Sequence, residues 1–467
     1  MAAILLPLPY PMLRSLIILA VFVPGFYWSL RSRYAAVLMY LWFALFRPQD
    51  WLWIDITSLR LSLVLGMVLL VPALLSGIGP NLSHPLSIGM LTFLASSLLS
   101  QWGAVQPALG WQWIDFIARL FVCCMLMVTI VNDGKKLTGV ILVIGGSLGF
   151  HAGKAGLAFA LGGGRFADGL AGAFVDNNGY ALGTVMIMPL LIAAAQNMAL
   201  LELPRPDLVK WVRRAFFLAV PFCGLAVIGT YSRGGFLSLC AAGLVFMLCQ
   251  KRRVMPLIVI TTLFAVGVAF VPQAYLDRLS TITKAKEIGE ESAMSRPHFW
   301  QVGIDMGMSR PFGVGLRQYE QAYDRYDFLH GRYGKKRAVH SSHVQVFAEL
   351  GFLGALTWTA MFAFAFYACY RVRRISTDER LSPEHQRLLF TMANALMASM
   401  AGFVVGGAFL ALALNDLTWL TFAAVAALDR IATGMLAAAP VPAPASRRVR
   451  VPLAFQVLDS IAEGRGV

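Results

Sequence analysis

A histidine followed by two serines marks a boundary in the chain. His340, Ser341 and Ser342 stand where a hydrophilic stretch gives way to an apolar one. An imidazole at a water boundary keeps a pKa of about 6.5, so it can take a proton from a hydroxyl or an amine at neutral pH. The same residues suit the N-terminus of a helix, with a serine as the N-cap and the histidine beside it. From the residues alone, both interpretations stay open.

An arginine at a glycine turn is the second candidate for chemistry. Arg233 is followed at once by Gly234 and Gly235, between two apolar stretches. Two helices that meet at such a turn leave backbone N–H groups and a guanidinium ready for an anion. An arginine that only reaches the lipid–water interface fits the pattern as well. Residues 295–323 add Arg296 and a Gly-Val-Gly turn, which is too short to be a phosphate-binding loop.

Further polar residues are secondary candidates for the same site. Asp176 precedes a predicted span and is equally suited to capping it. His343 follows His340 by three residues and shares its helical face if the helix has begun. Lys335 belongs to a basic run that would attract a diphosphate or anionic headgroups, or would simply be solvated. Arg317 lies in the hydrophilic stretch before this run.

The elements that must position these residues are membrane-spanning helices. Hydrophobic residues make up 58% of the chain and charged residues 13%, with a mean hydropathy of +0.68, which excludes an ordinary soluble domain. Each apolar stretch is long enough to cross about 30 Å of hydrocarbon as a helix. We therefore predict an all-α, polytopic bundle of about 12 to 13 spans. The candidates are residues 13–30, 33–46, 60–77, 85–101, 111–132, 137–158, 179–197, 214–231, 234–250, 254–271, 344–370, 389–413 and 416–437.

Basic residues predict how the bundle is oriented. The formal net charge of +15 would suit a nucleic-acid-binding protein, but the basic residues gather in short segments between the spans. This is the pattern of the positive-inside rule, which places such segments in the cytoplasm. Alternation of the spans then puts the Arg233 turn on the periplasmic side of an inner membrane. The clusters are Arg31 and Arg33, Lys135 and Lys136, Lys210 with Arg213 and Arg214, Lys251 to Arg253, Arg371 to Arg374, and Arg447, Arg448 and Arg450.

The chain divides into three predicted regions. These are an N-terminal transmembrane region over 1–170, a core over 171–440, and a basic cytoplasmic tail over 441–467. The core contains a hydrophilic loop over 272–342, the one large loop that we predict on the periplasmic side. Because several tyrosines and a tryptophan interrupt its charges, we expect this loop to fold against the bundle.

Taken in order, the three segments resemble the O-antigen ligase and polymerase superfamily of bacterial membrane glycosyltransferases. Members carry an arginine in an SRG-like turn and a periplasmic loop with three motifs, and the resemblance covers about residues 170–430. The most specific motif is His-[Asn/Ser/Gln]-x9-Gly-x-x-Gly, which closes the loop. The R-x-x-x-W motif corresponds to Arg296 and Trp300, the P-x-x-G-x-G motif, with one residue fewer here, to Pro311, Gly313 and Gly315, and the closing motif to His340, Ser341, Gly351 and Gly354. Phe46, Pro48 and Trp51 look like the putative O-glycosylation ligases that accompany exosortase systems.

The resemblance implies transfer of a glycan from undecaprenyl diphosphate to a protein or lipid acceptor on the periplasmic face. The reaction would invert the anomeric centre and need no metal, nucleotide or other cofactor. Arg233 and Arg296 would clamp the diphosphate, and His340 would be the catalytic base. Membrane lipids would be the remaining partners, with no role for nucleic acid.

Three alternatives stay open beside this expectation. A lipid-linked glycan polymerase uses the same donor and differs only in its acceptor. A polysaccharide transporter or flippase would show two halves with matching hydropathy, and the single long loop argues against such symmetry. A non-enzymatic scaffold is excluded only by the match to the motifs.

Overall fold

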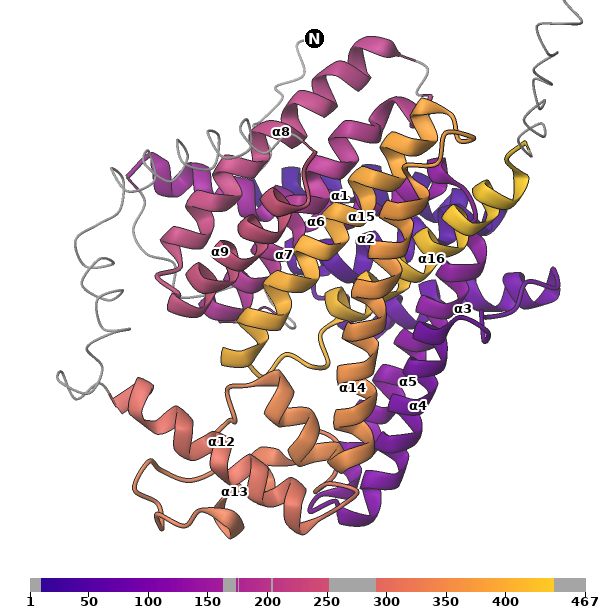
Figure 1. Cartoon of the computed structure of the whole chain (residues 1–467). Helices are drawn as coiled ribbons and strands as arrows, with labels where there is room; N and C mark the ends of the chain where they lie inside the picture. Colours follow the sequence, from indigo (N-terminus) through magenta and orange to yellow (C-terminus); the bar gives the residue numbers. More distant parts are fainter. Residues whose placement is uncertain (1–9, 163–173, 175, 203–204, 252–290, 441–467) are drawn as a thin grey trace, which may run out of the picture.

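The computed structural model describes residues 10–162, 174, 176–202, 205–251 and 291–440, and this part of the chain is helical (Figure 1). The all-α prediction is therefore confirmed. The α-helices are α1 (Tyr10–Arg31), α2 (Arg33–Phe46), α3 (Leu61–Leu75), α4 (Pro85–Ser100), α5 (Pro107–Ile130), α6 (Gly134–Ala160), α7 (Asn177–Asn197), α8 (Pro206–Gly229), α9 (Arg233–Leu248), α12 (Glu291–Ser309), α13 (Tyr319–Tyr326), α14 (Ser342–Ile375), α15 (Pro383–Gly406) and α16 (Asp416–Ala438).

Most of these helices can cross a membrane. Within the described residues, nine helices are long and apolar enough to do so, and α2 and α9 are shorter apolar helices. Each predicted span coincides with a helix except the one at 254–271, which lies outside the described residues. The chain is thus a multi-pass membrane protein, as its composition predicts.

Aromatic rings form the centre of the bundle where α4, α5, α14 and α16 meet. Trp419 on α16 is fully buried, and its ring centroid lies 4.8 Å from that of Phe93 and 4.5 Å from that of Phe121. Its indole N–H donates to the carbonyl of Ala413 at 3.0 Å, so the buried polar group is satisfied. These contacts hold α16 against α4 and α5.

Within the described residues, contacts of three of the basic segments join neighbouring helix ends. Lys135 pairs with Glu202 at 2.7 Å, and the Arg33 guanidinium donates to Ser76 at 3.0 Å. Arg373 donates to the carbonyl of Cys249 at 2.9 Å, which joins the ends of α14 and α9. The grouping accords with a single cytoplasmic side, and the assignment of this end to the cytoplasm stays a prediction from the positive-inside rule.

Some of the basic residues lie on helices rather than in loops as we expected. α8 begins at Pro206, so Arg213 and Arg214 lie about two turns into the helix. The Arg213 guanidinium lies over the ring of Phe217, and the Arg214 guanidinium lies over the ring of Trp211. Proline at the first position of a helix needs no hydrogen-bond partner for its nitrogen, which explains the early start. Long basic side chains reach water from such positions.

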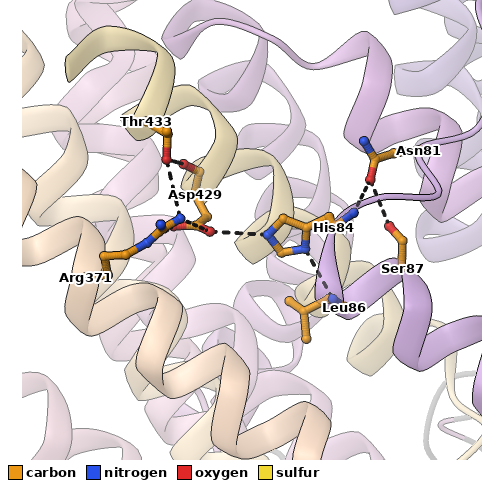
Figure 2. A network of polar contacts seen from close by, with 7 residues as sticks. All are labelled: Asn81, His84, Leu86, Ser87, Arg371, Asp429 and Thr433. Atoms are coloured by element: carbon orange, nitrogen blue, oxygen red, sulfur yellow. Dashed lines mark hydrogen bonds and ion pairs between the residues drawn. The ribbon is translucent and has the colours of Figure 1, made fainter. Parts of the chain in front are cut away.

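His84, Arg371 and Asp429 form a polar network at the end of the bundle that carries the basic segments (Figure 2). Asp429 on α16 accepts a hydrogen bond at 3.0 Å from the Nε of Arg371 on α14, and its other oxygen lies 3.3 Å from the Nε2 of His84. The Nδ1 of His84 accepts the N–H of Leu86 at 3.2 Å, so Nε2 is the nitrogen that donates to Asp429. The network joins α4, α14 and α16 far from the predicted catalytic end.

The described part of the long loop is folded, as predicted. α12 and α13 lie across the other end of the bundle, beside the start of α14 (Figure 1). Phe299, Tyr319 and Tyr323 are buried in a separate hydrophobic cluster there. The hydroxyl of Tyr319 donates to the carbonyl of Phe299 at 2.6 Å, which fixes the loop against α12. Residues 272–290 of the predicted loop lie outside the described part of the chain.

Candidate active site

His340 directly precedes α14 and has an unusual backbone. Its φ of 50° lies in the left-handed region, which residues other than glycine seldom adopt. Ser341 is the N-cap of α14, and its hydroxyl accepts a backbone hydrogen bond from the first turn. The hydroxyl of Ser342 donates to the carbonyl of Leu410 at 2.6 Å and accepts the N–H of Leu412 at 3.0 Å. The two residues that follow His340 are therefore held in place by their side-chain hydrogen bonds.

A kink in α14 explains the first glycine of the closing motif. Gly351 has a φ of 64° inside the helix, and a Cβ there would overlap the carbonyl oxygen of Pro311. The kink lets the Gly-Val-Gly turn dock on α14, where the N–H of Gly315 donates to the carbonyl of Glu349 at 3.1 Å. The number of residues between His340 and Gly351 therefore determines how far the histidine lies from the point where the turn docks on α14.

Arg233 is the first residue of α9, and the turn before it is joined to the start of α7. The hydroxyl of Ser232 donates to the side chain of Asn178 at 2.7 Å. Asn177 donates to a backbone carbonyl of the same turn at 2.8 Å. Asp176 is the N-cap of α7 and accepts two backbone hydrogen bonds. These contacts bring Arg233 and Asp176 to the same end of the bundle.

Phe409 lies near both segments that carry the two arginines proposed from the sequence. Arg296 and Trp300 lie one turn apart on α12, and the Arg296 guanidinium is 5.9 Å from the centroid of the Phe409 ring. The Trp300 ring lies 6.3 Å from the same centroid. The Cβ of Phe409 is 3.4 Å from where a Cβ would stand on Gly234, the neighbour of Arg233. The structure therefore brings α9 and α12 together around this ring.

The surroundings of His340 favour its neutral form. Burial lowers the pKa of the imidazole, and the positive charges of Arg296 and Arg337 lower it further, while Asp176 opposes them. The His340 ring lies 6.1 Å from that of Phe299, and the Arg337 guanidinium lies 5.6 Å from the Phe299 ring. A neutral imidazole beside two guanidiniums can accept a proton where a diphosphate would bind.

Comparison with protein families gives two matches along the chain. Residues 217–359 match the model of a family described as O-Antigen ligase. The chain carries an O-antigen ligase domain. Residues 13–197 match a family of unknown function, DUF5935, and no curated protein matches the chain.

The ligase match gives the chain a biochemical class. The O-antigen ligase family is a family of enzymes that transfer lipid-linked glycans, so the chain is a multi-pass membrane enzyme with such a substrate. The matched segment contains Arg233, Arg296 and His340, whereas Asp176 falls within the other match.

His343, Arg317 and Lys335 are the secondary candidates that lie within the ligase domain, and each has its own surroundings. The Nε2 of His343 lies 2.9 Å from the carbonyl of Val404, and its Nδ1 accepts the indole N–H of Trp358 at 3.0 Å. Both ring nitrogens are thus engaged, one by the carbonyl of Val404 on α15 and the other by Trp358 on α14 itself. Arg317 lies over the ring of Trp113 at 5.4 Å, and Lys335 is exposed. Neither is among the charges that act on His340.

Two residues of the site were not proposed from the sequence as individual candidates. Arg337 was noted only as part of a basic run, and its action on His340 depends on the fold of the loop. Glu349 is buried, and its carboxylate accepts the N–H of Arg317 at 2.8 Å and that of Tyr319 at 3.4 Å. An acidic residue within an apolar span was the available signal for Glu349.

Proposed function

We propose that this enzyme transfers a glycan from undecaprenyl diphosphate to a hydroxyl or amine of an acceptor on the periplasmic face of the bacterial inner membrane. The placement of His340 near Arg296, within the matched ligase domain, is the observation that carries the proposal. The grouping of basic segments at the opposite end of the bundle supports the periplasmic assignment.

A single displacement accounts for the reaction. The acceptor oxygen or nitrogen attacks the anomeric carbon while the bond from that carbon to the phosphate oxygen breaks. The electron pair of the broken bond leaves with the diphosphate, and Arg233 and Arg296 stabilise the charge that develops there. His340 takes the proton that the acceptor loses. Attack from the side opposite the leaving group inverts the anomeric centre.

The proposed mechanism needs no metal ion or other cofactor. Two guanidiniums supply the positive charge that a cation would otherwise bring to a diphosphate leaving group. Chelation of divalent cations should therefore leave the transfer rate of the purified enzyme unchanged.

We further propose that the acceptor is a protein, because of the sequence motif that ends at Trp51. Its ring lies 5.6 Å from that of Phe46, and the Phe46 carbonyl lies 3.1 Å from the Nε2 of His151 on α6. The resemblance of Phe46, Pro48 and Trp51 to the ligases that accompany exosortase systems is the observation that favours a protein acceptor. Mass spectrometry of the glycosylated product would test it, because a glycan found on lipid alone would refute the protein acceptor.

Complementation in cells tests the proposed function. A strain that lacks the native gene would receive the wild type, His340→Ala, Arg233→Ala or Arg296→Ala at matched membrane levels. Because each change removes a group that acts on the reacting atoms, we expect at least a hundredfold loss of transfer. The undecaprenyl-diphosphate-linked donor should accumulate in all three variant strains.

Two outcomes would contradict the proposal. Transfer at the wild-type level by His340→Ala would exclude the proposed base and favour a transporter or scaffold. A product with many repeats joined on the lipid would instead identify a polymerase. Lys335→Ala is the matched control, because this exposed cation lies outside the charges that act on His340.

A further inference from the structure

We propose that Trp300 and Phe409 form a subsite for the sugar that is attached directly to the diphosphate of the donor, with the indole N–H of Trp300 donating to an oxygen of that sugar. This inference rests on the proposed function, because it assigns a place to part of the same donor.

The indole N–H of Trp300 is buried and has no hydrogen-bond partner within the described part of the chain. A buried donor without an acceptor is costly, and native proteins satisfy most such groups. Trp419 illustrates the usual arrangement, since its indole N–H donates to a backbone carbonyl. An oxygen of the bound substrate would supply the acceptor that the indole N–H of Trp300 lacks.

The position of Trp300 places this donor next to the proposed diphosphate site. Trp300 follows Arg296 by four residues on α12, so both side chains lie on one face of the helix. Both also contact the region of Phe409, at 6.3 Å between ring centroids for Trp300 and 5.9 Å for the Arg296 guanidinium. The Cβ of Phe409 also lies 3.4 Å from the position that a Cβ would take on Gly234, the neighbour of Arg233. The aromatic pair therefore lies next to the Arg296 guanidinium and next to the turn that carries Arg233.

The chemistry of the pair selects the sugar over the other parts of the donor. An isoprenoid chain has no oxygen to accept the indole N–H, and the phosphates are the natural partners of the guanidiniums. A pyranose offers both C–H groups for the aromatic rings and hydroxyl oxygens for the donor. Trp300 and Phe409 are each half-buried, so their rings present a surface on which a sugar can pack.

Binding of two ligands to the full-length protein tests the subsite. One ligand is undecaprenyl diphosphate without a glycan, and the other is the glycan-bearing donor extracted from a strain that lacks the gene. The variants are Trp300→Phe, which removes the N–H and keeps a ring, and Phe409→Leu, which removes the ring. Trp102→Phe is the matched control, because Trp102 is 86% exposed and lies outside the proposed subsite.

We expect Trp300→Phe to weaken binding of the glycan-bearing donor about tenfold and to leave glycan-free undecaprenyl diphosphate within about twofold of wild type. Phe409→Leu should show the same selectivity, and the intact binding of the glycan-free ligand shows that each variant is folded. In the transfer assay the loss should appear mainly as a higher KM for the donor.

Equal weakening of both ligands by Trp300→Phe would overturn the inference, because the N–H would then serve the diphosphate. Unchanged binding of both ligands would overturn it as well. Neither result touches the proposed function, which would fail instead if the wild-type protein bound no glycan-bearing donor at all.

Discussion

His340 combines two features that its sequence motif alone does not reveal. Its backbone lies in the left-handed region, and its imidazole is partly buried beside positive charge. Both features are costly for a histidine that only flanks a helix cap, and such costs are common at functional sites. Ser341 caps α14, as the alternative interpretation predicted, so a catalytic role for His340 is supported by its backbone and its surroundings and not by the cap.

The pH dependence of transfer follows from the lowered pKa of His340. A base works in its neutral form, and a pKa below the ordinary value of about 6.5 keeps the imidazole neutral into mildly acidic solution. In a series of buffers from about pH 8 to about pH 5, the transfer rate should therefore fall on the acid side with a midpoint below about pH 6.5. Rates at saturating donor across this range check the prediction, and an acid limb above about pH 6.5 would contradict it.

Substitution of the neighbouring charges should move this acid limb in opposite directions. Arg337→Gln removes a positive charge that lowers the pKa of His340, so the limb should shift to higher pH. Asp176→Asn removes the opposing negative charge, so the limb should shift to lower pH. Comparison of the pH–rate curves of the two variants measures the effect. Identical curves would show that neither residue acts on the base.

Individual site residues could be predicted from the sequence where their type and spacing form a motif. The spacing of His340 and Gly351 and the Ser-Arg-Gly turn identified the matched ligase segment. Phe409 could not be chosen in the same way, because an aromatic residue in an apolar span is ordinary core. Its role depends on α9 and α12 meeting in space, which no local pattern shows.

At the scale of elements, the kink in α14 connects the loop to the membrane helices. The length of the apolar stretch predicted a single span over 344–370, whereas the helix is interrupted at Gly351. The turn 311–315 packs against the backbone of α14 at this interruption. The Glu349 carboxylate accepts the backbone N–H of Arg317, which follows the turn. An apolar window cannot reveal such a kink, because its cause is a contact with a distant segment.

Gly351→Ala should therefore damage the site although it touches no substrate. The new Cβ would meet the Pro311 carbonyl and would sit at a φ of 64°, so we expect a loss of about 2 kcal/mol or more in stability. Transfer should fall at least tenfold because the loop would no longer dock. Thermal unfolding of the purified variant and its transfer rate check the prediction.

Gly153→Ala on α6 is the matched control for this substitution. Gly153 has open space around the Cβ position, so alanine should be tolerated there with full activity. If Gly351→Ala behaved like this control, the kink would not be needed to position the loop.

At the scale of the whole molecule, the two ends of the bundle differ in chemistry. One end carries the basic segments and the network of His84, Arg371 and Asp429 (Figure 2). The other carries the folded loop and the candidate site, with α12 and α13 lying across it (Figure 1). Composition and charge patterning predicted this division well, because lipid and the positive-inside rule constrain every span in the same way.

Labelling from outside the cell should establish which end faces the periplasm. Arg332→Cys places a thiol in the exposed part of the loop, and Glu384→Cys places one at the start of α15 on the basic end. A membrane-impermeant maleimide admitted only to the periplasm should label the first variant and leave the second unlabelled until the inner membrane is opened. The wild type, whose own cysteines lie in membrane helices, gives the background, and the reverse pattern would contradict the orientation.

Transfer by the purified enzyme is the most direct test of the central claim. The chain, or its His340→Gln variant, would be reconstituted in liposomes with the donor and acceptor membranes from the deletion strain, and both products would be measured. We predict that the wild type releases one undecaprenyl diphosphate for each glycan that reaches the acceptor, whereas His340→Gln binds the donor and releases at least a hundredfold less. Transfer by His340→Gln at the wild-type rate, or loss of donor without a glycosylated acceptor, would contradict the account.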